Sequence, residues 1–375
     1  MRIAIIGAGI GGLAVAAALH QRGFAIEVYE QADKFARVGA GLQQSPNAVK
    51  VHRGLGIEDR VRQVANRPAS SLNRDGITGA ITNDHPLGAA VEARYGAPYL
   101  TMHRGDLHEA LLSVVPGESI HLGRKLTAVT ARGPRTELSF ADGSAVEADL
   151  VIGADGVHSL IREHVVGPDQ ARFTGRVAYR TTYPLALLRG VEMTTSRTKW
   201  WGPDRHIVIY LVTPDEIYFT TSTPERADWI SRESWSTKGD LGELRAAFAH
   251  FHPDVRAVLA ASPEVHKWGI FERDPLPTWR RGRVVLLGDA CHPMTPYMAS
   301  GAGMALEDAA VLARCLTDIR NVDTALEIYE ATRKSRASAV QQGSSANNWM
   351  RNATNPDWLY GYNPWTAPLG EPVAA

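Results

Sequence analysis

A glycine-rich turn between two apolar segments, within the first thirty residues, constrains the fold of this chain more than any other feature. Residues 2–6 predict a buried strand, residues 10–22 a helix of small side chains, and residues 26–30 a second strand. A strand–helix–strand unit of this length implies two parallel strands joined by a right-handed crossover. The sequence therefore predicts an α/β fold that begins with a parallel sheet.

The turn has the spacing Gly7-x-Gly9-x-x-Gly12. Gly7 permits a tight turn, Gly9 lets the backbone approach a pyrophosphate, and Gly12 lets the helix pack closely on the strand. Glu30 ends the second strand, where an acid binds a ribose with a free 2′-hydroxyl and repels a 2′-phosphate. Close packing alone would not require Glu30, so we predict a bound dinucleotide.

Distant segments are expected to extend this sheet. Residues 148–156 and 283–290 each predict a buried strand that runs into a turn of Gly and Asp. Residues 170–270 differ, because apolar and polar residues alternate there as in half-buried antiparallel strands. Two helices are expected after residue 303, at 304–318 and 322–345.

These patterns predict a Rossmann-like domain with an inserted, mainly antiparallel β-sheet domain for the substrate, and C-terminal helices. An aromatic tail follows, which would be a lid, an interface or a packing strap. The expected division is a discontinuous cofactor domain at 1–70, 98–168 and 270–345, a substrate domain at 71–97 and 169–269, and a tail at 346–375.

The bulk composition gives no support for several classes of partner. Lys and Arg together number 40, as do Asp and Glu, so nothing points to nucleic acid or an acidic membrane surface. Cys291 and Cys315 are too few for a disulfide framework and lack the spacing of metal ligands. The apolar N-terminal run is interpreted as folded structure rather than a signal peptide, and no apolar run reaches transmembrane length. We expect a cytoplasmic monomer or homodimer without a metal.

The segment 288–309 predicts a place for an electron-rich ring. Asp289 ends a predicted strand, where it would accept hydrogen bonds from a polyol such as a ribityl chain. A helix then begins with small residues, and its bare N–H groups and dipole would stabilise the negative charge of a reduced isoalloxazine. A proline stiffens the loop before this helix. The residues assigned to this flavin site are Asp289, Pro296, Gly301, Ala302, Gly303 and Met304.

The glycine motif with Glu30, the Asp155-Gly156 turn and "GDACHP" occur in an order that resembles the FAD-dependent aromatic hydroxylases, the single-component flavoprotein monooxygenases. The resemblance spans roughly the whole chain and implies bound FAD. It implies that Arg37 and Arg104 lie along the FAD phosphates or sugar, although Arg104 would also suit an ordinary helix start. It associates Asp155 with both FAD and NAD(P)H. Since FAD takes the one glycine motif, NADH or NADPH would bind transiently in a cleft.

A strand in the antiparallel region supplies candidate catalytic residues. In "DRHIVIY", His206, Val208 and Tyr210 share one face because side chains alternate along a strand. Facing the flavin, the imidazole and the phenol would bind a ring hydroxyl or carboxylate, or help to remove a phenolic proton. The alternative is that both residues only pack within the sheet.

Within the family, "KWWGPDRHIVIY", the segment 288–309 and the tail resemble the 6-hydroxynicotinate 3-monooxygenases, which hydroxylate a pyridine ring at the carbon bearing the carboxylate and release CO2. The resemblance assigns their active-site His and Tyr to His206 and Tyr210. It departs at Gln43, where those enzymes carry another His; Gln43 exchanges hydrogen bonds but cannot take a proton. Similarity to 3-hydroxybenzoate 6-hydroxylases and salicylate hydroxylases therefore stays open.

The resemblance implies a specific reaction. NAD(P)H would reduce FAD, O2 would form a flavin C4a-hydroperoxide, and a hydroxylated aromatic or pyridine carboxylic acid would attack its distal oxygen. Decarboxylation would follow if the attacked carbon carries the carboxylate. An alternative of another class is a flavin oxidase or reductase that inserts no oxygen.

Overall fold

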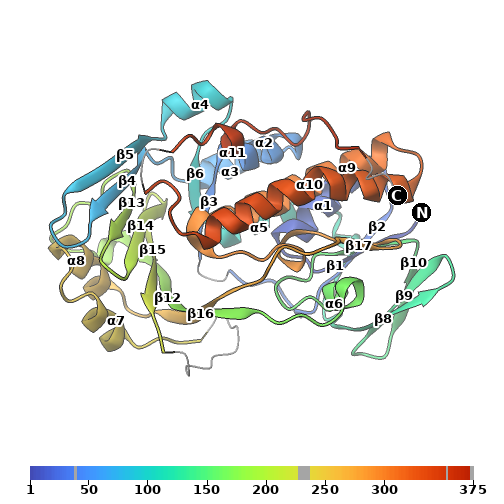
Figure 1. Ribbon diagram of the computed structural model, residues 1–375, viewed down its shortest axis with the longest axis horizontal. Coiled ribbons are helices and arrows are strands. Elements are labelled where there is room, and N and C mark those ends of the chain that lie inside the picture. The colour runs from blue at the N-terminus through green and yellow to red at the C-terminus, as the bar shows by residue number, and fades with distance from the viewer. Residues whose placement is uncertain (38–39, 227–236, 352–353, 372–375) are drawn as a thin grey trace.

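The computed structural model describes residues 1–37, 40–226, 237–351 and 354–371. Residues 352–353 and 372–375 of the predicted tail lie outside the described residues. The α/β architecture expected from the sequence is confirmed, with one parallel sheet and one larger antiparallel sheet side by side (Figure 1). In the described parts of the chain, no helix combines the length and the apolar character needed to cross a membrane.

The parallel sheet is assembled from distant segments, as the turn pattern predicted. Its strand order is β17-β18-β11-β1-β2-β7, and only β17 at the edge runs antiparallel to its neighbour. The strands are β1 (Ile3–Ile6), β2 (Ile26–Tyr29), β7 (Ile120–His121), β11 (Leu150–Gly153), β17 (Arg280–Arg281) and β18 (Val284–Leu286). Because β1 lies between β2 and β11, the carboxyl ends of all three central strands meet at one edge.

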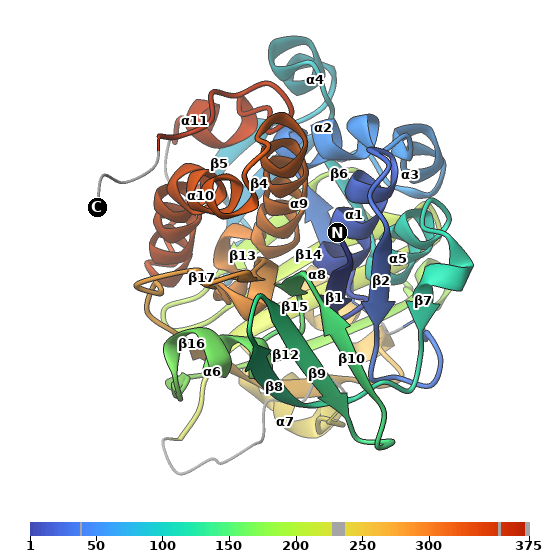
Figure 2. The ribbon, with the colours of Figure 1, turned by 90° about the vertical axis from the view of Figure 1, so that its right-hand side faces the viewer.

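Helices from both ends of the chain pack on this sheet (Figure 2). The small side chains of α1 allow close approach to α9, and a Cβ at Gly11 would lie 3.3 Å from the Cβ of Ala305. The helices that do not cover the outer face of the antiparallel sheet are α1 (Ile10–His20), α2 (Pro46–Gly54), α3 (Glu58–Val64), α4 (Ala89–Tyr95), α5 (Arg104–Leu112), α6 (Leu160–Val166), α9 (Gly301–Asp318), α10 (Val322–Ser345) and α11 (Asp357–Tyr360).

Two smaller sheets complete this half of the molecule. One is the hairpin-linked sheet β8 (Leu126–Arg132), β9 (Arg135–Phe140) and β10 (Ala145–Ala148). The other pairs β3 (Gly41–Gln44) with β6 (Leu100–His103). The β3–β6 pair matters for function, because it lies against the antiparallel sheet: Thr101 Oγ1 donates to the carbonyl of Leu211 at 2.7 Å.

The antiparallel sheet has the order β16-β12-β15-β14-β13-β4-β5, and within it only β13 and β4 pair in parallel. Its strands are β4 (Ser70–Asp75), β5 (Ile81–Pro86), β12 (Arg172–Pro184), β13 (Arg197–Trp201), β14 (His206–Thr213), β15 (Glu216–Pro224) and β16 (His266–Glu272). Two helices, α7 (Leu241–Ala247) and α8 (Pro253–Ala261), cover its outer face, where Ile207 and Ile209 are buried (Figure 1). Val208, Tyr210 and Val212 occupy the opposite, inner face.

The described part of the C-terminal tail packs as a strap across the helices. Lys50 Nζ donates to the carbonyls of Tyr360, Gly361 and Tyr362 at 3.0, 3.1 and 3.3 Å. Arg336 donates in the same way to the carbonyl of Trp358 at 2.7 Å. These cations satisfy backbone acceptors of the short helix α11 and of the residues after it, so side chains of α2 and α10 hold the tail in place.

Candidate active site

The N-terminal turn leaves room where a cofactor phosphate would approach. A Cβ at Gly7 would lie 2.5 Å from the carbonyl oxygen of Ala154, and one at Gly12 would lie 1.9 Å from the carbonyl oxygen of Gly7. These glycines are therefore required by the fold. A Cβ at Gly9 would meet nothing within 4 Å, so this position opens onto free space in front of α1. The arrangement fits a group that binds against bare backbone.

Glu30 closes the second strand and braces the same turn. Its Oε2 accepts a hydrogen bond from the Ala8 N–H at 2.8 Å, and its Oε1 accepts one from the Ala32 N–H at 2.9 Å. A carboxylate oxygen has a second lone pair, so Glu30 keeps acceptor capacity for a ribose hydroxyl. Sequence reasoning missed His108, whose Nε2 lies 2.8 Å from the Ala8 carbonyl oxygen and supports the turn from α5.

The N-terminus of α9 lies beside that of α1 and carries no cap. Ser300, the residue before the helix, makes no capping hydrogen bond, and the first turn contains no acid. The N–H groups of Gly301, Ala302 and Gly303 precede the first intrahelical bond and are positioned to meet an electron-rich group. Met304 differs from the prediction, because its N–H already donates to the Ser300 carbonyl at 2.8 Å.

Asp289 and Arg104 face this region without partners of their own. The Asp289 side chain is solvent-exposed, yet desolvation by the surrounding protein raises its pKa. Burial lowers the pKa of Arg104, and the charge of Asp289 opposes that shift. Within the described chain, neither side chain makes a hydrogen bond or an ion pair. Pro296, in the loop before α9, is exposed as well.

Two of the predicted cofactor residues have protein partners instead. Arg37 pairs with Asp106 at 3.0 Å and with Glu216 at 3.2 Å, so the structure directs its guanidinium toward acids of this chain. Both oxygens of Asp155 serve the start of α6, accepting from Ser159 Oγ at 2.5 Å and from the Ile161 N–H at 3.1 Å. Desolvation raises the pKa of Asp155.

The three predicted catalytic residues lie on the inner face and against it. Tyr210 packs on the backbone of β3, where a Cβ at Gly41 would lie 2.7 Å from the tyrosine oxygen. The side chain of Gln43 acts on this phenol and partly opposes the effect of burial on its pKa. Gln43 Oε1 also accepts from the Tyr99 hydroxyl at 2.6 Å. Burial raises the pKa of Tyr210 well above its ordinary value, so its phenol stays protonated.

His206 lies farther along the same face, between two aromatic rings. The ring centroids of Trp201 and Tyr297 lie 4.9 and 5.6 Å from that of the imidazole. Burial, followed by the charges of Lys199 and nearby arginines, lowers the pKa of His206 well below its ordinary value. The imidazole is therefore neutral, and its nitrogens have no hydrogen-bond partner in the described structure.

Sequence reasoning missed two cations on the neighbouring strand. Arg197 and Lys199 are 6% and 3% exposed and lie on β13, beside β14. The alternation of "RTKWW" would have placed them on one face, but only the fold shows that this face is buried and that neither cation pairs with an acid among the described residues.

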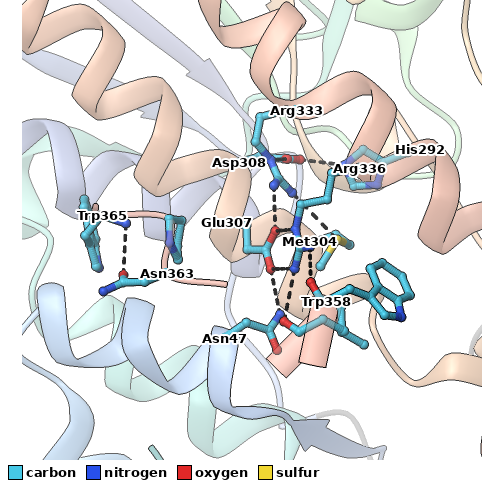
Figure 3. A network of polar contacts seen from close by, with 12 residues as sticks. Asn47, His292, Met304, Glu307, Asp308, Arg333, Arg336, Trp358, Asn363 and Trp365 are labelled. Atoms are coloured by element: carbon cyan, nitrogen blue, oxygen red, sulfur yellow. Dashed lines mark hydrogen bonds and ion pairs between the residues drawn. The ribbon is translucent and has the colours of Figure 1, made fainter. Parts of the chain in front are cut away.

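A buried ion network, also missed, holds α9 in place (Figure 3). Arg333 of α10 pairs with Glu307 at 2.6 Å and with Asp308 at 2.7 Å, and all three side chains are wholly buried. Asp308 Oδ2 also accepts from the Gly288 N–H at 3.1 Å and lies 2.6 Å from His292 Nε2. The network therefore fixes the turn on both sides of Asp289 relative to the uncapped helix.

Residues 1–344 match the protein family described as FAD binding domain. The chain belongs to the FAD-dependent aromatic hydroxylases. It is similar to 6-hydroxynicotinate 3-monooxygenase of Bordetella bronchiseptica, with 46% identity over 99% of this chain and 97% of the relative. The enzyme of that name from Pseudomonas fluorescens is 45% identical, with the same coverage. A variant of Klebsiella pneumoniae HpxO solved with FAD has a TM-score of 0.83 and 29% identity, over 92% of this chain and 89% of that chain.

The aromatic hydroxylase is thus an FAD-dependent monooxygenase, as its motifs predicted. Its residues fit the group, since open backbone at Gly9, the acceptor Glu30 and the uncapped α9 match a pyrophosphate, a ribose and an electron-rich ring in turn.

Proposed function

We propose that this monooxygenase uses NADH or NADPH and O2 to hydroxylate a hydroxylated aromatic or pyridine carboxylic acid. We further propose a substrate like 6-hydroxynicotinate, which loses its carboxylate as CO2. The single observation that carries the proposal is the pair of a neutral His206 and a protonated Tyr210 on one buried face of β14, with Gln43 of β3 packed against that face. Near-full-length similarity to two 6-hydroxynicotinate 3-monooxygenases supports the ring class.

The cofactor residues have distinct tasks in this proposal. Gly9 would admit the pyrophosphate of FAD, Glu30 would bind its ribose and Asp289 its ribityl chain. Donors at Gly301, Ala302 and Gly303 would stabilise charge on the flavin ring. FAD, when bound, supplies the activation of oxygen, and the protein supplies binding, orientation and the exclusion of water. The predicted division into cofactor and substrate domains remains a prediction, as do the roles of Arg37 and Asp155.

The substrate's ring hydroxyl would be handled by the three buried side chains. A neutral imidazole accepts a proton or a hydrogen bond, so His206 would draw the hydroxyl proton away from the ring. Tyr210 would donate a hydrogen bond to a ring substituent, and Gln43 would orient Tyr210. Electron density then rises at the ring carbons ortho and para to the hydroxyl. If the attacked carbon carries the carboxylate, loss of CO2 restores aromaticity.

A second candidate is a hydroxybenzoate or salicylate hydroxylase. The observation that favours it is Gln43, whose carbonyl oxygen is taken by the Tyr99 hydroxyl and which offers no titratable group at that point of the pocket. A substrate with a benzene ring has no ring nitrogen, so it would not need a group that exchanges a proton at the position of Gln43. Release of CO2 would indicate the salicylate reaction, since the 3-hydroxybenzoate reaction keeps the carboxylate.

The test is a substrate screen of the FAD-loaded protein. 6-Hydroxynicotinate, 3-hydroxybenzoate and salicylate are each supplied with NADH or NADPH, while nucleotide oxidation, oxygen uptake and peroxide release are followed. Product mass and CO2 are measured together, because uncoupled peroxide formation imitates turnover. We expect hydroxylated product and CO2 from 6-hydroxynicotinate. Nucleotide oxidation that yields only peroxide with every acid would contradict the proposal and favour an oxidase or reductase.

A further inference from the structure

Two buried cations on β13 have no acidic partner. Arg197 donates through Nη1 to Ser71 Oγ, and its Nε has no hydrogen-bond partner at all. Lys199 Nζ reaches only Asn347 Oδ1, at 3.5 Å, and lies 3.8 Å from the centre of the Trp201 ring. Neither cation forms an ion pair with any residue that the structure describes.

An unmatched buried guanidinium is unfavourable for folding. Its removal from water is costly unless an anion or a set of acceptors replaces the water. One serine oxygen supplies a single acceptor for the five N–H groups of Arg197. Ser71 alone therefore leaves this guanidinium short of acceptors, which an anionic ligand would supply.

The position of Arg197 identifies the kind of ligand. Lys199 pairs in register with Val208, so Arg197 and Lys199 share the inner face with His206 and Tyr210. Burial raises the pKa of three phenols, those of Tyr99, Tyr210 and Tyr360, and the charge of Arg197 opposes that shift in each of them. Tyr360 comes from the C-terminal strap, and its ring centroid lies 5.9 Å from that of Tyr99. An aromatic anion suits this wall of phenols around one guanidinium.

We propose that Arg197 binds the carboxylate of the aromatic substrate and makes that carboxylate a requirement for binding. The proposal rests on the proposed function and names the residue that selects the substrate's charge. The planar fork of Arg197 would accept a carboxylate with two parallel hydrogen bonds, which a lysine cannot match. Lys199 would add to the positive potential without contacting the carboxylate in this way.

The experiment compares matched acids and amides as ligands of the FAD-loaded protein. Benzoate and benzamide, then 6-hydroxynicotinate and 6-hydroxynicotinamide, are titrated while the flavin absorbance spectrum is recorded. A charge-assisted buried contact corresponds to about a 30- to 100-fold preference for the acid. We expect this preference to fall to within about 3-fold in Arg197→Gln, with amide binding unchanged, and to recover in part in Arg197→Lys.

Lys199→Met is the matched control, since it removes the neighbouring buried cation from the same face. It should retain most of the preference for the acid. The proposal is overturned if the wild type binds the acid and its amide equally well, or if Arg197→Gln keeps the wild-type preference for the acid. It is also overturned if Lys199→Met loses more of this preference than Arg197→Gln does. Parallel loss of acid and amide binding in Arg197→Gln would show a structural role and also overturn it. Acids that bind with the expected preference but yield no product would instead refute the proposed function alone.

Discussion

This monooxygenase contains two sets of buried charges, and they differ in whether oppositely charged side chains lie beside them. Behind α9, Arg333 lies between Glu307 and Asp308, so each buried charge there has an opposite charge within 3 Å (Figure 3). On the inner face of the antiparallel sheet, Arg197 and Lys199 are also buried but form no ion pair with any acid in the part of the chain that the structure describes.

The difference separates structure from function. A matched network is self-sufficient, so it can hold the turn around Asp289 and the start of α9 in one geometry. An unmatched cation leaves the free protein less stable than it could be, and that deficit is recovered only when a ligand arrives. Four experiments break or sharpen this contrast.

The largest effect is expected from Arg333→Gln. It removes the buried cation that Glu307 and Asp308 share and leaves them only Arg336 and His292 as partners, which should lower the free energy of unfolding by about 3 kcal/mol. Urea denaturation measures the change. The control is Arg283→Gln, which breaks an ion pair with Asp323 at the surface and should cost at most about 1 kcal/mol. Equal losses in the two variants would show that the network is not the matched, stabilising device described above.

Next come the inner-face residues His206 and Tyr210. We expect His206→Ala and Tyr210→Phe each to lower substrate turnover about 100-fold, as removal of a proton-handling group does. FAD content and the urea midpoint should change little, because neither residue belongs to the matched network. Coupled turnover and flavin absorbance are measured on the same samples. Parallel loss of FAD and turnover would mark both residues as structural.

The matched network should also make stability fall in acid. Burial opposes ionisation of Asp308, but the charges of His292 and Arg333 outweigh it and lower its pKa to about 2. Because the pKa is lower in the folded than in the unfolded chain, stability is present above about pH 4 and is lost as the pH falls toward 2. The loss is about 2 kcal/mol. Urea midpoints at pH 4, 3 and 2 should fall more steeply for the wild type than for Asp308→Asn; equal slopes would contradict this origin.

The smallest expected effect is a gain, not a loss, in the free energy of unfolding. Lys199→Met replaces an unmatched buried cation by an apolar side chain of similar length, which should stabilise the folded protein by about 1 kcal/mol. Burial and the neighbouring arginines lower the pKa of Lys199 well below its ordinary value, in keeping with this gain. Thermal unfolding without substrate measures it. A clear loss of stability would mean that the contact with Trp201 or an unrecognised acceptor satisfies this lysine.

Much of the fold was predictable from local patterns. The strands at 2–6 and 26–30 and the helices at 304–318 and 322–345 fall within a few residues of the observed elements, since their periodicity reflects burial on one side. The two helices α7 and α8 were missed within the stretch 170–270. They are short, and their apolar faces are buried only because the sheet is there to cover.

The candidate site was predictable to a smaller degree, and Arg37 shows why. The resemblance implies that it lies along the FAD phosphates or sugar, which stays a prediction, whereas its pairing with Asp106 and Glu216, from a helix and a strand far along the chain, was not predicted. Charged side chains are long and their partners are set by folding, so position in a motif does not determine what they bind. The glycines lack this freedom, and their predicted turn agrees with the observed φ of +99° at Gly7.

The sequence by itself determined the parallel sheet, the glycine turn and the helix that starts without a cap. These follow from steric limits on the backbone and from the period of apolar residues, which act over a few neighbours. Only the tertiary structure decided that Arg333 meets two acids while Arg197 meets none. Such pairing depends on which distant segments exclude water from a side chain together, and no local pattern records it.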